Sequence, residues 1–178
     1  MRRTILTLIL ALFATIFLGG CSSTAPALLR SQSIAALADF QHADSSLDIL
    51  LKSSYGYAIF PRVTTGALVV GGSHGDGEVY QAGKFQGTAE VSQGSIGVQA
   101  GGQRFAELVL FRTESRYLDF THNTWEFDAR ASAIAAANGK AATADYSKGV
   151  LVFTLPEGGL MAQAAVGVQK FSFHKQNP

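Results

Sequence analysis

The chain contains one cysteine, Cys21, and the position of that residue limits how the chain can be held together. Two arginines precede an apolar run from Thr4 to Leu18, and two glycines stand directly before the cysteine. A positive start, a short apolar run and small residues before a cleavage point are typical of a secretory signal. The run is shorter than the roughly 20 residues that a membrane-spanning helix needs. We therefore expect residues 1–20 to be removed.

The residues around Cys21 also indicate how this cysteine is used. Leu18-Gly19-Gly20-Cys21 resembles the bacterial lipobox, in which the thiol accepts a diacylglycerol group and the cysteine becomes the first residue, carrying acyl chains such as palmitate. The alternative is an ordinary signal peptide that happens to precede a cysteine. In the sorting rule for such lipoproteins an acidic second residue favours the inner membrane, so Ser22 favours the outer membrane. We expect a lipid-anchored envelope protein that faces the periplasm.

The rest of the chain is nearly neutral and long enough for one core. Without the two arginines of the signal, 12 Lys and Arg residues remain against 13 Asp and Glu. Nucleic-acid binding needs a cluster of cations that neutralises phosphates, so the composition argues against a nucleic-acid partner. Lipidation of the only cysteine excludes disulfides and cysteine-ligated metals. We divide the chain into a signal (1–20), a lipidated tether (21–30) and a single domain (31–175).

The beginning of the domain has a helical pattern over residues 28–53. Apolar residues recur every three or four positions, which places them on one side of a helix; they are Ile34, Leu37, Phe40, Ala43, Leu47 and Leu50. Asp44 or Ser45 is suited to start a second helical piece. The polar face carries mainly aspartates, whereas helices that lie on membranes are rich in Lys and Arg. We expect this helical segment to pack on the body of the domain.

From Tyr55 the pattern changes to short apolar runs that are punctuated by glycines. We expect Pro61 to end a strand, residues 73–77 to form a turn, and Thr113 to cap a short helix over 114–120. The expected strands are 57–60, 66–71, 78–80, 84–90, 95–100, 107–111, 125–133, 148–155 and one or more within 161–173. The sequence thus predicts an α+β fold, mainly antiparallel β and barrel-like or sandwich-like, with an N-terminal helical segment.

Several residue groups have spacings found in active or metal sites, but their context favours other interpretations. His74, Asp76 and Glu78 lie in the expected glycine turn, where a solvated hairpin tip is the simpler reading. Ser172 and Lys175 have a spacing that works on a helix, whereas on a strand they face opposite sides. His122 and Glu126 lack the helix that a zinc motif requires. We expect no catalytic site, metal or other cofactor.

Several motifs, taken in order, resemble the SYLF domain family. They are Ser54 to Pro61, Gly66 to Gly72, Gly75 to Val79, Gly94 to Gln103 and Asp145 to Leu151. The resemblance covers roughly residues 34–173 and is to the bacterial lipoprotein branch. It implies a lipid-binding module without enzymatic activity. Eukaryotic members bind phosphoinositides at membranes, and fungal members are also described as binding actin filaments.

Two hypotheses for function follow. In the first, the domain binds phospholipid surfaces beyond its anchor at Cys21. The candidate contacts are cations near expected loops and strand ends, namely Arg62, Lys84, Arg104, Arg112 and Arg116. In the second, the domain is structural or docks an unidentified envelope protein, and the acyl chains are its only lipid contact. The cations would then pair with acidic residues such as Glu107, Glu114 and Asp119 and face water on different sides.

Overall fold

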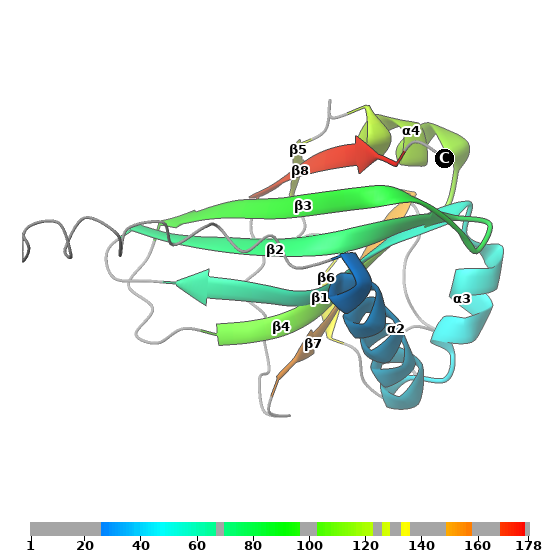
Figure 1. The fold of residues 1–178 in the computed structure, drawn as a ribbon, viewed down its shortest axis with the longest axis horizontal. Coiled ribbons are helices and arrows are strands. Elements are labelled where there is room, and N and C mark those ends of the chain that lie inside the picture. Colours follow the sequence, from blue (N-terminus) through cyan, green and yellow to red (C-terminus); the bar gives the residue numbers. More distant parts are fainter. Residues whose placement is uncertain are drawn as a thin grey trace, which may run out of the picture.

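A computed structural model shows one curved β-sheet with helices packed on it (Figure 1). It describes residues 26–66, 70–96, 103–122, 126–128, 133–135, 149–157 and 168–176, so the expected signal segment and Cys21 lie outside the described residues. The elements are α2 (Pro26–Ala43), α3 (Leu47–Ser53), β1 (Gly56–Gly66), β2 (Val70–Gln81), β3 (Lys84–Ile96), β4 (Gln103–Phe111), α4 (Glu114–Thr121), β5 (Glu126–Asp128), β6 (Ala133–Ala135), β7 (Val150–Pro156) and β8 (Val168–Lys175). Within these ranges, no helix is both long and apolar enough to cross a membrane.

The sheet has the strand order β5-β8-β3-β2-β1-β4-β7-β6. Every pairing is antiparallel except that of β6 with β7, which confirms the predicted α+β class with mainly antiparallel strands. The sheet is strongly curled. Asp128 on β5 and Ala133 on β6 are five positions apart in the chain, so at most about 18 Å separates these two edge strands. In a flat sheet the same two edges would lie about 34 Å apart.

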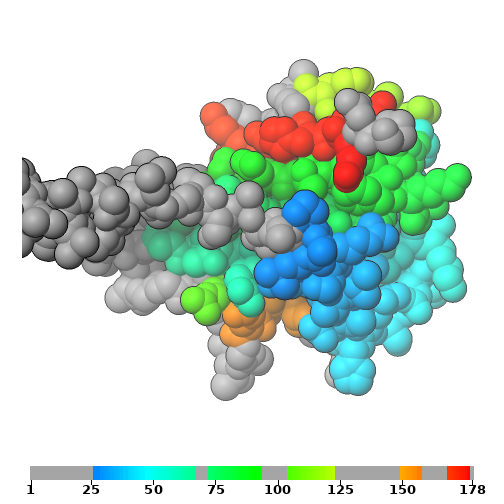
Figure 2. Space-filling view, in the orientation of Figure 1, coloured from blue at the N-terminus to red at the C-terminus, as the bar shows by residue number. Residues whose placement is uncertain are grey.

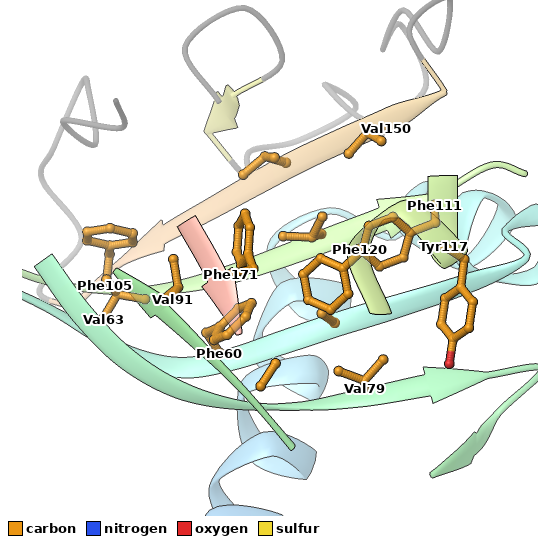
Figure 3. Close-up of a cluster of buried hydrophobic side chains, with 14 residues drawn as sticks. Phe60, Val63, Val79, Val91, Phe105, Phe111, Tyr117, Phe120, Val150 and Phe171 are labelled. Carbon is orange, nitrogen blue, oxygen red and sulfur yellow. The ribbon is translucent and has the colours of Figure 1, made fainter. Parts of the chain in front are cut away.

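The inner face of the curled sheet holds an aromatic core (Figure 3). The rings of Phe60 on β1 and Phe171 on β8 have centroids 5.7 Å apart, although β2 and β3 lie between these strands. Phe120 of α4 packs 5.1 Å from Phe171, so α4 covers this face at one end of the strands. As predicted, Thr113 caps α4 and accepts a hydrogen bond from the Arg116 amide. Leu118, on the same helix, is 38% exposed.

The outer face is covered by α2 and α3, which Figure 2 shows below β3 and β8. The prediction of two helical pieces is confirmed, and the Asp44 side chain accepts a hydrogen bond from the Ser46 amide between them. The predicted buried face is wrong in part, because Ile34 is 60% exposed while Ser33 and Ala36 are buried. Small side chains at these two positions let the helix approach the strands closely. The first helical turn also occupies residues 26–30, which we assigned to the tether.

The expected turn at residues 73–77 is wrong, because these residues lie in the middle of β2. The expected strand end at Pro61 is also wrong: β1 continues through a bulge at Pro61 and Arg62, where its register with β2 and β4 shifts. The glycines of β2 make room for this bulge. A Cβ at Gly75 would lie 2.7 Å from the Arg62 carbonyl oxygen. Glycine here serves close strand packing and not a turn.

The other strand predictions differ mainly in their bounds. Residues 84–96 form one strand, β3, where we expected two strands, and the turn that precedes it is at Ala82 and Gly83. The run from Glu107 to Phe111 lies in β4 and is buried on both faces, as predicted. The described parts of the expected strand 125–133 are β5 and the first residue of β6. Residues 97–100, Trp125 and residues 129–132 lie outside the described residues.

Candidate functional site

The five candidate cations divide into two groups at opposite ends of the strands. Arg104 pairs in register with Thr64 near the end of β1, and Arg62 is at the nearby bulge. Lys84, Arg112 and Arg116 lie at the other end, beside the β2–β3 turn and α4. Arg104 lies on β4 and Arg112 directly follows this strand. The eight positions between them correspond to a distance of about 26 Å along the strand. The five residues therefore do not form one cationic face.

Arg62 lies between two shallow pockets that flank the start of α2. One pocket of about 290 Å³ is lined by Leu28, Leu29, Gln32, Pro61, Arg62, Thr64, His74, Gly75 and Asp76. The other, of about 270 Å³, adds Ala106, Glu157 and further α2 residues to Gln32, Pro61 and Arg62. The bulge in β1 pushes Pro61 and Arg62 outward, because Phe60 and Val63 both stay in the core. We call this surface, with Arg104 beside it, the α2-start surface.

The charges on the α2-start surface are exposed and only partly paired. Arg62 Nε lies 3.1 Å from Glu157 Oε1, and both side chains are about half exposed, so the pair contributes little to stability. The amide of Glu157 donates to the Arg104 carbonyl oxygen, which places the Arg104 backbone next to this pair. Leu28, at the start of α2, is 51% exposed. Cations and an exposed apolar side chain thus occur on the same surface.

The opposite end of the sheet carries the second group of cations and another pocket. Arg116 Nη1 lies 3.3 Å from Asp119 Oδ2, one turn away on α4. Glu114 instead accepts a hydrogen bond from the Tyr55 hydroxyl. The pocket measures about 350 Å³ and is lined by Gln81, Gln86, Tyr117, Leu118, Thr121, His122, Phe173 and Lys175. This end can hold a small amphipathic or anionic group, but it faces away from the α2-start surface.

The residue groups with catalytic or metal-site spacings do not converge. His74 Nε2 lies 3.7 Å from Asp76 Oδ1, while Glu78 is buried and accepts a hydrogen bond from the Tyr80 hydroxyl. Within the described ranges, no group of three or more His, Cys, Asp or Glu side chains is placed to hold a metal. Ser172 and Lys175 lie on β8, where residues three apart point to opposite sides. His174 Nε2 lies 3.8 Å from Glu90 Oε1.

The inner face becomes polar towards the end of the sheet that contains the α2-start surface. One row of buried polar side chains crosses four neighbouring strands in register, from Thr65 to Ser73, Gln93 and Gln169. On the next strands Glu107 stands opposite Thr154, and both are buried. Buried polar side chains are unusual in a core, because each one needs a hydrogen-bond partner there.

Glu107 is the charged residue among these buried polar side chains of the described inner face, and it was not among our candidate contacts. Its Oε2 accepts a 2.8 Å hydrogen bond from Gln169 Nε2, and its side chain is fully buried. Burial raises the pKa of the Glu107 carboxyl to about 7, although the hydrogen bond from Gln169 acts in the opposite direction. The signal in the sequence was a carboxylate inside an otherwise apolar strand. We had assigned Glu107 only as a possible surface partner of the cations, and that assignment is wrong.

Arg30 is a second residue that the sequence analysis missed. Its guanidinium lies 5.9 Å from the Tyr80 ring and 5.6 Å from the Phe85 ring, so it packs α2 onto β2 and β3. Tyr80 also stacks on Tyr57 with ring centroids 4.9 Å apart. Burial and the neighbouring Glu78 raise the pKa of Tyr80. No residue pattern near Arg30 identifies this contact, since its partners are about 50 residues away in the chain.

Comparison with known proteins gives one distant relative and no family assignment. No family model matches the chain. The chain is 23% identical over 149 residues to Beta cell expansion factor A from Aeromonas veronii. The match covers 83% of this chain but 56% of that protein, so the chain spans about half the length of the relative. The similarity covers most of the chain and does not establish what the domain binds.

Proposed function

We propose that the protein is a lipoprotein of the cell envelope, anchored through Cys21, whose domain binds phospholipid surfaces through the α2-start surface. Its fold would then orient a weak, charge-dependent lipid contact and would carry no catalytic activity. The resemblance to SYLF domains supplies the expectation of lipid binding. The name of the Aeromonas veronii relative describes an effect on beta cells and mentions no lipid, so the argument for the surface depends on geometry.

The observation that carries the proposal is the position of the α2-start surface relative to the anchor. Pro26, the first residue of α2, is five positions after Cys21, and five residues span at most about 18 Å. Leu28 and Leu29 line a pocket together with Arg62. An acyl chain on Cys21 would therefore hold this surface, and not the opposite end of the sheet, close to the bilayer.

The charge on the surface fits a weak contact that depends on the anchor. Each cation near an anionic bilayer contributes about 1 kcal/mol at low salt. Arg62 is partly neutralised by Glu157, and Arg104 adds a second exposed charge. Two such charges give weak, salt-sensitive binding for a free domain. Held near the bilayer by acyl chains, the same charges act at a high local concentration.

The second candidate function is docking of an envelope protein without lipid binding by the domain. It is favoured by the three cations and the 350 Å³ pocket at the far end of the sheet. An anchor near α2 would turn that end away from the membrane. The two functions therefore predict that different groups of cations matter for binding to lipid.

The test uses residues 22–178 without acyl chains and measures co-sedimentation with neutral and anionic liposomes at low and high salt. We expect weak binding that needs anionic lipid, falls with salt and is lost in Arg62→Ala/Arg104→Ala. Lys84→Ala/Arg112→Ala removes the same charge at the far end and is the matched control. Equal loss in both double variants would mean that only net charge matters. Absence of binding to every liposome would favour the docking function.

A further inference from the structure

We propose that Glu107 carries a proton in the folded protein and that its carboxylic acid forms a pair of hydrogen bonds with the side-chain amide of Gln169. This acid–amide pair would link β4 to β8 across the inside of the curled sheet. Because one of the two bonds needs the proton, the link would weaken when the acid ionises. The inference is independent of lipid binding.

The first of the two hydrogen bonds is present in the structure. Gln169 Nε2 donates to Glu107 Oε2 over 2.8 Å. Strands β3, β2 and β1 lie between β8 and β4 in the sheet, and in a flat sheet these two strands would be about 19 Å apart. The contact therefore crosses the interior. It joins strands that share no backbone hydrogen bonds within the described sheet.

The second bond is indicated by two buried oxygens. Glu107 Oε1 and Gln169 Oε1 are fully buried and have no hydrogen-bond partner within the described part of the chain. Each is bonded to the same carbon as an atom of the observed hydrogen bond, so a planar acid–amide pair would bring the two oxygens to hydrogen-bonding distance. With an ionised Glu107 both oxygens are acceptors only, and they repel each other. A proton on Glu107 Oε1 turns one of them into a donor and satisfies both at once.

No charge in the described interior would stabilise an ionised Glu107. On the inner face, β1 presents Phe60, β7 presents Thr154, β3 presents Val91 and Gln93, and β8 presents Gln169 and Phe171. Tyr117 of α4 and Tyr55 are titratable groups on this face within the described ranges; their rings pack on each other, and Tyr117 lies at the far end beside Phe111. Glu78 is also buried, but it is bonded to Tyr80 of the outer cluster. The shift of the Glu107 pKa towards 7 by burial agrees with a bound proton.

Ionisation of Glu107 would then leave a buried carboxylate with one hydrogen bond and an amide oxygen directed at it. The simplest relief is separation of β8 from β4, which would open the polar end of the interior. The α2-start surface lies at the same end of the strands, where Arg104 and Thr64 are paired. A rise in pH would therefore loosen the sheet at this end first.

The experiment compares the full chain with Glu107→Gln and with the exchanged pair Glu107→Gln/Gln169→Glu across about pH 5 to 8.5. The glutamine variant keeps two hydrogen bonds as an amide–amide pair and cannot ionise. We expect the thermal midpoint of the native chain to fall relative to Glu107→Gln as the pH rises. The exchanged pair should show the same fall of the thermal midpoint with pH, since it still contains one acid, now on β8. After correction for the intrinsic pH dependence of amide exchange, protection of the β8 amides should fall over the same pH range in the native chain and in the exchanged pair, but not in Glu107→Gln.

Infrared spectroscopy tests the proton directly in the native chain and does not depend on the stability of a variant. The carbonyl band of a protonated carboxylic acid should be present near neutral pH and should disappear at high pH. Its absence at pH 6, or pH profiles that run parallel in native chain and Glu107→Gln, would overturn the proposal. So would a midpoint that Na⁺ or K⁺ raises in the native chain but not in Glu107→Gln at equal ionic strength. That result would assign the free oxygens to a bound cation.

Discussion

Gly77 on β2 lies against the ring of Phe60 on β1, so closely that a Cβ at Gly77 would be 2.5 Å from Phe60 Cδ1. The same Cβ would lie 2.6 Å from the Ile59 carbonyl oxygen. Phe60 is fully buried and its ring packs on Phe171, so it cannot move aside without disturbing the aromatic core. The absence of a side chain at Gly77 is therefore a condition for the packing of β1, β2 and β8.

Gly77→Ala is expected to destabilise the domain by about 1–3 kcal/mol, the usual cost of extra volume in a packed core. Gly66→Ala is the matched control, since a Cβ there meets nothing within 4 Å. Urea unfolding, monitored by tryptophan fluorescence or circular dichroism, measures the stability of both variants. Equal stability of the two variants would show that β1 moves to accommodate the methyl group.

Phe171→Ala is expected to cost about 3–5 kcal/mol in the free energy of unfolding, because it leaves a cavity between Phe60 and Phe120. Val168→Ala, at a position on the same strand that is 44% exposed, should change the stability by less than about 0.5 kcal/mol. Chemical denaturation of both variants measures the difference. If Phe171→Ala cost no more than Val168→Ala, β8 would not be part of the cooperative core.

The buried carboxyl of Glu107 should make the domain less stable as the pH rises. Its pKa is raised from 4.5 to about 7 in the folded protein, and we take the ordinary value for the unfolded chain. Between these values the folded state binds more protons than the unfolded state, so the free energy of unfolding falls with increasing pH. The shift corresponds to about 3 kcal/mol, present in full below pH 4.5 and lost above pH 7.

The measurement is the difference in unfolding free energy between native chain and Glu107→Gln at about pH 4 and pH 8. Other carboxylates titrate in both proteins and cancel in this difference. We expect the native chain to lose about 3 kcal/mol relative to the variant between the two conditions. A difference that stays constant with pH would mean that Glu107 titrates normally and that water reaches it.

Acylation at Cys21 is a prediction that depends on the sequence alone. Mass spectrometry of the membrane fraction should find diacylglycerol, and an N-acyl chain, on Cys21 of a chain that begins there. Cys21→Ser should lose the modification and leave the chain unprocessed at that position. Wild-type protein that is unmodified and cleaved elsewhere would contradict the prediction and remove the argument for the membrane orientation of α2.

The secondary structure was predictable where local patterns decide it. Thr113 and the apolar positions after it identified α4, and the run ending at Phe111 identified a strand covered on both faces. The prediction failed at Gly75 and Gly77, which have the composition of a turn but serve the close approach of β1 and β2. The bulge that they accommodate is in a neighbouring strand, about 15 residues earlier in the chain, so the sequence around these glycines does not reveal it.

The candidate site was less predictable than the fold, because it too depends on contacts between residues that are distant in the sequence. Arg62 and Arg104 were identified as cations, but only the strand register shows that they are near each other and far from Arg112. The contact of Glu107 with Gln169 joins residues 62 positions apart. It depends on the curl of the sheet, which no property of either residue predicts.

The strand order also constrains how the chain can fold. β5 (Glu126–Asp128) pairs with β8, which follows it by about 40 residues, and β8 itself pairs with β3, which precedes it by more than 70. β5 therefore has no partner in the described sheet until the distant β8 pairs with it. Folds with such distant pairings have a high contact order and fold slowly, on the scale of milliseconds to seconds. A chain of this topology would therefore stay unfolded longer than one in which every strand pairs with its neighbour in sequence.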